Sequence, residues 1–409
     1  MMKLIKILLF MIIPIMGFNQ TVRVKTGIEM LRESGFSVLK QKKVGLITNP
    51  TGVDSKLQSS IDIIFQSKAC SLVALFGPEH GVRGNFTAGD AINSETDEKT
   101  GIPVYSLYGK SRKPDAEMLR GIDVLVYDIQ DIGVRSYTYI STMGLAMEAA
   151  AENNITFVVL DRPNPLGGYR VEGPLVEDGF FSFVSQFKIP YVYGLTAGEL
   201  ALYLNSTKPD SLRCKLHVVK MKGWNRSMTF EQTGLPWVPA SPHIPRANSS
   251  FYYAISGILG ELDANMIGVG YTLPFEVFAT TYANADKVAT QMNALNMEGV
   301  IFRPIYFKPY YMAQKDKEFS GVQVHITDFK KISLTEIQFR FSEVMHQLYP
   351  EKSVFDGVPD RYAMFDKVCG TDKIRIAFLK NHKFDDIKDL WNNDAVEFKQ
   401  KSEKYYLYK

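Results

Sequence analysis

The chain has 409 residues, of which 45% are hydrophobic and 22% are charged, a composition typical of a globular protein. Its formal net charge of +3 comes from dispersed basic residues, which excludes the broad basic surface that nucleic-acid binding requires. Because one hydrophobic core rarely organises a chain of this length, we expect two domains.

The first 20 residues have the pattern of a secretory signal peptide. Two lysines precede an apolar run over residues 7–16, and a short, more polar tail follows it. The run is shorter than the roughly 20 residues that a membrane-spanning helix needs, and no later run approaches that length. We therefore expect residues 1–20 to be removed on export, and the mature protein to be periplasmic or extracellular without stable membrane insertion.

Residues 21–247 are predicted to form an α/β domain with a Rossmann-like parallel sheet. Short apolar runs alternate there with stretches of helical pattern, and continuous apolar runs are typical of strands that are buried on both faces. Strands are expected at residues 44–48, 72–76, 104–107, 124–127 and 157–160. Helices are expected at residues 55–66, 115–119 and 141–153.

A polar or glycine-containing cluster follows directly after four of these strands. Ligands of open α/β sheets bind beyond the carboxyl ends of the strands, so we expect the four clusters to line one crevice. The clusters are residues 49–52, 77–81, 128–131 and 161–165.

The pattern changes near residue 248, and residues 248–409 are predicted to form a second, smaller α+β domain. Strands are expected at residues 300–307 and 322–326, and helices at residues 284–295, 334–348 and 385–401. We expect the active cleft to lie between the two domains.

Signatures of several enzyme classes are missing from the sequence. The glycines at 268 and 270 lack the third glycine of a dinucleotide-binding loop, and neither a Walker loop nor a His-Glu-x-x-His motif occurs. His80, His243, Asp90 and Asp128 match no known spacing of metal ligands. We therefore expect neither a metal nor a cofactor.

Glu79 is the leading catalytic candidate, in the segment Gly77-Pro78-Glu79-His80-Gly81. It follows an apolar strand, next to a proline that fixes φ and close to a glycine that tolerates unusual φ. Burial in a crevice raises the pKa of a carboxyl group, as a general acid requires, whereas nearby cations lower it. The competing interpretation is a glutamate that caps a helix or forms a salt bridge.

Arg135 supplies a guanidinium group close to two phenols, those of Tyr137 and Tyr139. Arginine binds a carboxylate through two parallel hydrogen bonds, so this segment suits a sugar that carries a carboxylate. Alternatively, Arg135 pairs with Asp128 or Asp131 and holds the loops together.

Five long motifs closely resemble those of the exo-acting β-N-acetylmuramidases, the NamZ-like family of glycoside hydrolases. The likeness continues through residues 194–201, 237–242 and 274–276, and therefore covers most of the chain. It implies release of N-acetylmuramic acid from the non-reducing end of peptidoglycan fragments without a cofactor, and it makes Glu79 the catalytic glutamate. The motifs are residues 46–52, 75–84, 128–139, 160–168 and 172–174.

Hydrolysis of a glycoside needs a second group that attacks the anomeric carbon or activates water. The candidates are Asp128, Asp131, Glu172 and Glu261, of which we select Asp128 and Glu172, and the acetamido oxygen of the sugar is an alternative nucleophile. Arg135, helped by Arg162, is expected to bind the lactyl carboxylate of the sugar. The other predicted substrate-binding residues are Asn49, His80, Arg83, Gln130, Asp131, Tyr137, Tyr139, Asp161, Asn164, His243 and Glu261.

Two segments depart from the family pattern. His243 and Ile244 replace the asparagine and methionine of the usual Ser-Pro-Asn-Met-Pro, and residues 261–264 and 267–270 replace Glu-Gly-Thr-Asn and Glu-Gly-Arg-Gly. An arginine and a glutamate are thus missing on the side of the second domain. Two alternatives therefore stand beside the muramidase: a non-catalytic protein that binds cell-wall glycans, and an exo-hexosaminidase with altered specificity.

Overall fold

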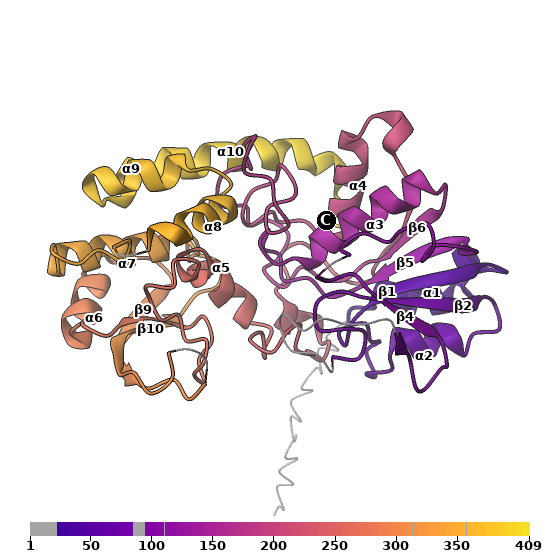
Figure 1. Ribbon diagram of the computed structural model, residues 1–409, viewed down its shortest axis with the longest axis horizontal. Helices are drawn as coiled ribbons and strands as arrows, with labels where there is room; N and C mark the ends of the chain where they lie inside the picture. Colours follow the sequence, from indigo (N-terminus) through magenta and orange to yellow (C-terminus); the bar gives the residue numbers. More distant parts are fainter. Residues whose placement is uncertain (1–22, 85–94, 110, 312–313, 357) are drawn as a thin grey trace, which may run out of the picture.

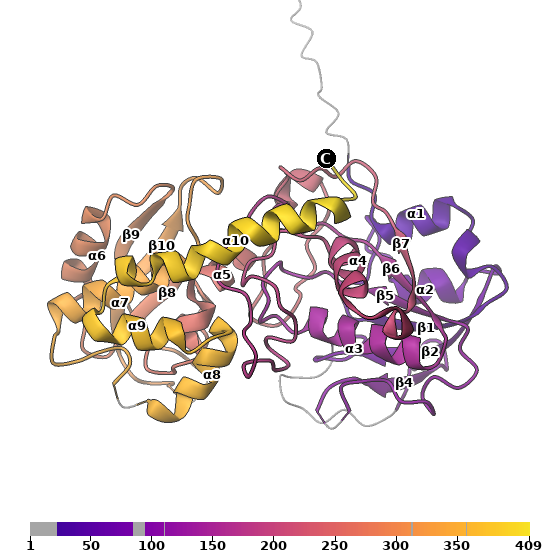
Figure 2. The same ribbon diagram turned by 90° about the horizontal axis from the view of Figure 1, so that it is seen from above.

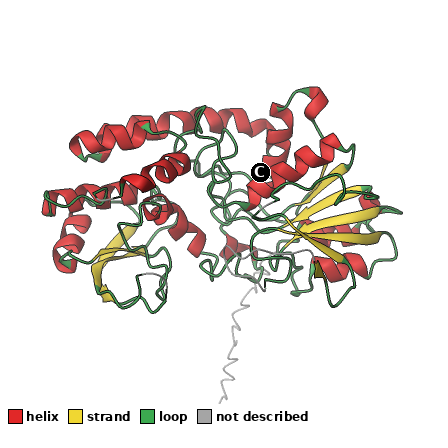
Figure 3. Cartoon of the chain, in the orientation of Figure 1, coloured by secondary structure: helices red, strands yellow, loops and turns green. Residues whose placement is uncertain are grey.

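The computed structural model describes residues 23–84, 95–109, 111–311, 314–356 and 358–409, so the predicted signal peptide lies outside the described residues. A seven-stranded sheet and a three-stranded sheet lie toward opposite ends of the molecule (Figure 1 and Figure 3). The predicted fold class, a Rossmann-like parallel sheet with a smaller α+β part, is confirmed.

Six strands of the larger sheet are parallel, and the short strand β3 pairs with β4 in the antiparallel direction at one edge. All five predicted strands are present, because strands buried on both faces read as continuous apolar runs. The edge strand β7 is only partly buried. In sheet order the strands are β3 (Glu95–Thr96), β4 (Pro103–Ser106), β2 (Ser71–Gly77), β1 (Lys43–Thr48), β5 (Val124–Asp128), β6 (Thr156–Leu160) and β7 (Lys215–Val219).

Helices cover both faces of this sheet. Side chains alternate along a strand, so that Leu46 packs in one core with helices α1 (Gly27–Glu33) and α2 (Ser60–Phe65). Ile47 packs on the opposite face in a core with α3 (Tyr139–Glu152) and α4 (Ala197–Thr207). The helix expected at residues 115–119 is instead a turn, and the one expected at 55–66 is restricted to α2.

The smaller sheet is antiparallel, with the order β8 (Val277–Thr280), β10 (Phe319–Ile326) and β9 (Val300–Phe307). Buried and exposed residues alternate along most of β9, as is usual for a sheet with one face toward solvent. The three helices predicted here correspond to α6, α7 and α10. The helices of this part are α5 (Ser249–Gly260), α6 (Ala285–Ala294), α7 (Glu336–Leu348), α8 (Pro359–Cys369), α9 (Lys373–Asn381) and α10 (Lys388–Ser402).

The end of the chain returns to the parallel-sheet part, and α10 runs from one part to the other (Figure 2). The Tyr408 hydroxyl donates a hydrogen bond to Asp161 at 2.6 Å, and the backbone N–H of Leu407 donates one to Glu199 at 2.8 Å. These bonds fix the two parts of the molecule to each other. Among the described residues, no helix is long and apolar enough to cross a membrane.

Candidate active site

A pocket of about 660 Å³ is lined by residues from both parts of the molecule. Of the four loop clusters predicted to line one crevice, only residues 77–81 contribute to its wall. The other three clusters contribute Thr51, Gln130 and Arg162 to the wall of a smaller hollow. The pocket is lined by Glu79, His80, Ser136, Tyr137, Thr138, Tyr139, Ser241, Pro242, His243, Ile244, Tyr253, Phe275 and Tyr311.

Glu79 lies half-buried in this pocket, two residues beyond the end of β2. The next two residues, His80 and Gly81, both have positive φ angles, of 74° and 75°, so the backbone turns sharply after the glutamate. The pKa of Tyr108 is raised by burial and then by the charge and hydrogen bond of Glu79. Among the described residues Glu79 forms no ion pair, which favours the catalytic interpretation over the salt-bridged one.

Three tyrosines form one side of the pocket, here called the tyrosine wall: Tyr137, Tyr139 and Tyr253. The ring of Tyr137 lies edge-on to those of Tyr139 and Tyr253, with centroids at 5.0 and 5.7 Å. Burial raises the pKa of all three phenols, so they are neutral donors. Hydrogen bonds from Ser241 to Tyr137 and from Tyr137 to Tyr139 oppose these shifts in pKa, so the hydroxyls are connected to one another and to the pocket wall. An aromatic surface that carries hydroxyl groups fits a sugar ring.

His243 and Tyr311 lie together on another side of the pocket. The Nε2 atom of His243 is 2.8 Å from the Tyr311 hydroxyl, and the two rings are stacked with an interplanar angle of 18°. Burial lowers the pKa of His243, and the charge of His80 lowers it further. His243 is therefore mainly neutral near pH 7, and it offers a polar ring rather than a fixed charge.

Asp131 is buried close to the tyrosine wall, where its charge acts on Tyr137, Tyr139 and Tyr253. Its Oδ2 atom accepts hydrogen bonds from the Gly133 N–H at 2.7 Å and from the Tyr193 hydroxyl, and Oδ1 has no partner among the described residues. Burial raises the pKa of Asp131 to about 6, although its hydrogen bonds oppose the shift.

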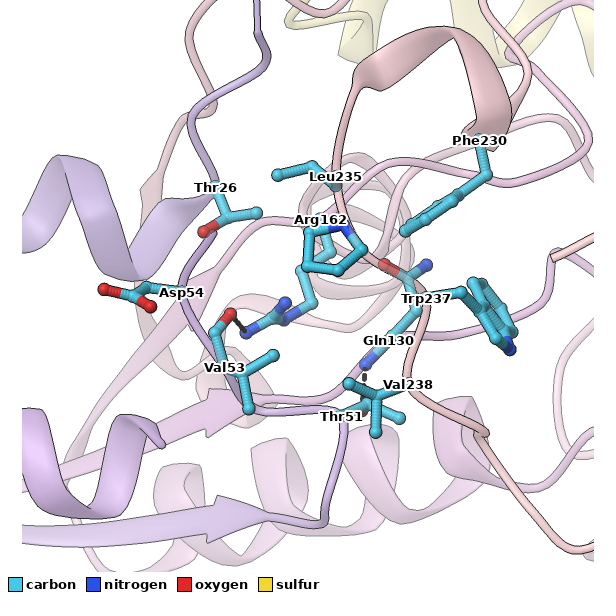
Figure 4. A pocket seen from close by; sticks show the side chains of 11 residues that line it. Thr26, Thr51, Val53, Asp54, Gln130, Arg162, Phe230, Leu235, Trp237 and Val238 are labelled. Carbon is cyan, nitrogen blue, oxygen red and sulfur yellow. Dashed lines mark hydrogen bonds between the residues drawn. The ribbon is translucent and has the colours of Figure 1, made fainter. Parts of the chain in front are cut away.

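The predicted catalytic residue Asp128 is fully buried in an ion pair with Arg162. The Arg162 guanidinium donates to both carboxylate oxygens, at 2.6 and 3.0 Å, and to the Val53 carbonyl at 2.9 Å. Figure 4 shows Arg162 beside Gln130 in a hollow of about 20 Å³, a volume suited to one water rather than a sugar. The Asp128 carboxylate and the Arg162 guanidinium therefore hold the ends of strands β5 and β6 together.

Arg135 does not line the pocket, although the sequence analysis expected it to bind a carboxylate. Its guanidinium is fully buried and donates to four backbone carbonyls, those of Pro174, Ile189, Val368 and Cys369. The competing expectation, an ion pair with Asp128 or Asp131, is not observed either. Arg135 instead joins the loop before α3 to the end of α8.

Other predicted residues also have protein partners. Both oxygens of Glu172 accept hydrogen bonds, one from Arg170 at 2.8 Å and the other from the Thr335 N–H at 2.9 Å. Gln130 donates to two backbone carbonyls, and Arg83, which lies outside the pocket, pairs with Asp97 at 2.8 Å. These side chains are engaged in the fold.

Four predicted residues remain. Asp161 accepts hydrogen bonds from Thr196, Gly198 and Tyr408, and Asn164 bonds to the backbone of Leu166 and Leu195. Asn49 orders its own turn through Oδ1, and a hydrogen bond from its side chain to Tyr139 of the tyrosine wall opposes the rise in the pKa of that phenol. Glu261 is 3.7 Å from Arg361, and burial raises its pKa.

Four residues of the pocket wall were not among the predicted site residues: Ser136, Tyr253, Phe275 and Tyr311. The Ser136 hydroxyl is 3.2 Å from that of Tyr253, on helix α5. Phe275 has a positive φ of 68°, which is rare for an aromatic residue and marks a constrained turn. The signal available for Phe275 was its place in the family motif at residues 274–276, whereas Tyr253 and Tyr311 lie in ordinary helix and loop sequence.

Models of the two domains of the exo-β-N-acetylmuramidase NamZ family match almost the whole described chain. The N-terminal domain model matches residues 44–248 and the C-terminal one residues 251–408. The chain belongs to the NamZ family. Both segments that departed from the sequence motifs lie within these matches, so they are variations inside the family.

Relatives of known sequence or structure support this membership. The peptidoglycan β-N-acetylmuramidase NamZ of Bacillus subtilis is 42% identical over 393 residues, which cover 95% of this chain and 93% of that protein. A crystal structure of a DUF1343 family protein from Bacteroides fragilis has a TM-score of 0.91 and 58% identity, over 95% of this chain and 100% of that one. Another, from the same organism, has a TM-score of 0.72 and 29% identity, over 94% and 99% of the two chains.

Proposed function

We propose that this protein is an exo-β-N-acetylmuramidase that hydrolyses terminal, non-reducing N-acetylmuramic acid from peptidoglycan fragments. The observation that carries the proposal is the position of Glu79, half-buried beside a tyrosine wall in a 660 Å³ pocket at the end of strand β2. Membership of the NamZ family and the activity named for the Bacillus relative support it. The test is to compare the hydrolysis of a muraminide and a glucosaminide by the purified protein.

Glu79 is assigned as the proton donor to the leaving oxygen. It is the carboxyl group that lines the pocket among the described residues, and the Tyr108 hydroxyl is available to orient it. Proton transfer to the oxygen assists cleavage of the bond to the anomeric carbon. The tyrosine wall binds the sugar with neutral hydroxyls, which do not compete for the proton.

Asp131 is assigned to the second role, in place of Asp128 and Glu172. Both oxygens of each of those two carboxylates are bound by protein donors, whereas Oδ1 of Asp131 has no side-chain or backbone partner in the described part of the chain. With its pKa near 6, Asp131 is mainly ionised at neutral pH and still basic enough to accept a proton or to orient the acetamido group of the sugar.

This assignment predicts the acid limb of the pH profile. As pH falls through about 6, Asp131 takes up a proton, so kcat/KM should decrease about tenfold per pH unit below that point. In Asp131→Asn the limb at pH 6 should be lost together with most of the activity. Asp161→Asn is the matched control: burial also raises the pKa of Asp161 to about 6, and neither aspartate lines the pocket, but the charge of Asp131 acts on the three tyrosines of the pocket wall and that of Asp161 does not. A limb that disappears in the Asp161 variant and persists in the Asp131 variant would refute the assignment.

A second candidate function is an exo-hexosaminidase that prefers N-acetylglucosamine. The observation that favours it is the absence of arginine and lysine from the pocket wall, within the residues that the structure describes. A lactyl carboxylate would then be met by the neutral donors of His243, Tyr311 and Tyr137 rather than by a fixed charge.

A further inference from the structure

The segment between α5 and β8, residues 261–270, departs from the family motifs and does not line the pocket of Glu79. Met266 exchanges two backbone hydrogen bonds with Ala279, at 2.8 and 3.0 Å, so the segment adds to the free edge of strand β8. Gly268 has a φ of 91°, and a Cβ atom there would lie 1.9 Å from the carbonyl oxygen of Leu273. The backbone of this segment is therefore tightly fixed.

Asn265, in the middle of the segment, is only 7% exposed. Neither its Nδ2 donor nor its Oδ1 acceptor has a hydrogen-bond partner among the described residues. Buried amides are nearly always paired, because an unpaired one loses its bonds to water and gains nothing in return. An unpaired donor and acceptor on one side chain therefore indicate a place where a ligand binds.

Asn265 lines a second pocket, of about 450 Å³. A water molecule occupies roughly 30 Å³ of the liquid, so this space suits a small organic ligand. Its wall is largely apolar, and two oppositely charged residues, Asp263 and Lys317, belong to it and are exposed. The pocket is lined by Gly260, Asp263, Ala264, Asn265, Met266, Ile267, Val269, Thr280, Thr281, Tyr282, Gln314, Lys317 and Phe319.

We propose that this pocket binds a short peptide through one of its backbone amides. The carboxamide of Asn265 offers one donor and one acceptor, which complement the C=O and N–H groups of a peptide unit. Asp263 and Lys317 form no ion pair within the described part of the chain, and they match the ammonium and carboxylate groups of a zwitterionic peptide. An uncharged acetamido sugar would offer no oppositely charged group to either Asp263 or Lys317.

The proposal rests on the proposed function for the source of the peptide. A peptide joined to the lactyl group of N-acetylmuramic acid is acylated at its amino terminus and carries no ammonium there, so the zwitterionic ligand is a free peptide, released from such a fragment by hydrolysis of that amide bond. A site for the free peptide on the second part of the molecule would make the enzyme sensitive to peptide released from its own class of substrate.

Isothermal titration of the purified protein with an alanyl-glutamate dipeptide tests the inference. We expect the wild type to bind the dipeptide, and Asn265→Ala to bind it at least tenfold more weakly because both amide hydrogen bonds are lost. Asn265→Asp, which keeps the acceptor and loses the donor, should also bind it more weakly. Asn392→Ala, on the exposed face of α10, is the matched control and should bind like the wild type.

N-Acetylglucosamine, titrated in parallel, separates an amide-bearing sugar from a peptide. Failure of the dipeptide to bind the wild type, unchanged binding by Asn265→Ala, or preferential binding of N-acetylglucosamine would each overturn the proposal. Because the titration does not depend on turnover, a protein that binds the dipeptide but hydrolyses no muraminide would refute the proposed function alone.

Discussion

Replacing Glu79 with glutamine should reduce kcat on a muraminide by about 10² to 10⁴, because an amide cannot donate the proton that the leaving oxygen needs. Glutamine has the same shape as glutamate, and Glu79 forms no ion pair among the described residues, so the melting temperature should stay close to that of the wild type. Substrate binding to the tyrosine wall should persist. Steady-state kinetics and thermal unfolding of the same preparation measure both effects.

The matched control for this variant is Glu117→Gln. Glu117 is an exposed glutamate that pairs with Arg120 in a turn and does not line the pocket. Its substitution should change neither kcat nor the melting temperature. Near-normal turnover by a folded Glu79→Gln protein would rule out Glu79 as the general acid.

Replacing Arg135 with methionine should destabilise the protein by roughly 3 to 5 kcal/mol, the largest stability effect that we expect from one substitution. Methionine fills much of the volume but leaves four buried carbonyls, on three separate segments, without the donors they now have. Arg135→Lys should also destabilise the fold, since one ammonium group cannot reproduce the planar fork. Denaturant unfolding measures the loss.

The same variant distinguishes a structural arginine from one that binds substrate. In the structural role, any loss of kcat/KM in Arg135→Met falls equally on muraminide and glucosaminide substrates. A selective loss on the muraminide at an unchanged melting temperature would instead assign Arg135 to the lactyl carboxylate. Arg120→Met, at an exposed surface pair, is the control for removal of a guanidinium group and should leave stability unchanged.

The sequence was sufficient for the larger sheet because its strands are buried on both faces. All five residues of β5 are buried, and the run Val124 to Asp128 is apolar until its last residue. Strand β7 has a weaker apolar pattern because it lies at the edge of the sheet and is nowhere fully buried. The turn at residues 116–121 was mistaken for a helix because a short polar stretch between strands has no periodicity strong enough to decide.

The candidate site was predictable where local sequence fixes local geometry. The proline before Glu79 and the glycine two residues after it indicate a turn that presents the glutamate at the end of a strand. The role of Arg135 was not predictable in this way. Its local sequence suits a substrate carboxylate as well as buried carbonyls, and two of those carbonyls lie 233 and 234 residues further along the chain.

The residues that the second part of the molecule contributes to the pocket wall could not be predicted from local sequence either. Tyr253 and Tyr311 come together with Tyr137 and His243 only when the two sheets are fixed to each other. That arrangement depends on Arg135, on α10 and on the last residues of the chain. Long-range packing of this kind leaves no short pattern in the sequence.

The most direct test of the central claim is hydrolysis of two chromogenic substrates by the purified protein, a β-N-acetylmuraminide and the matching β-N-acetylglucosaminide. A hydrogen bond to a charged group contributes about 1.5 to 3 kcal/mol, so recognition of the lactyl carboxylate should favour the muraminide by roughly one to two powers of ten in kcat/KM. The account predicts that preference, and it predicts that Glu79→Gln loses activity on both substrates. Turnover of neither substrate by the wild type, or equal or faster hydrolysis of the glucosaminide, would contradict it.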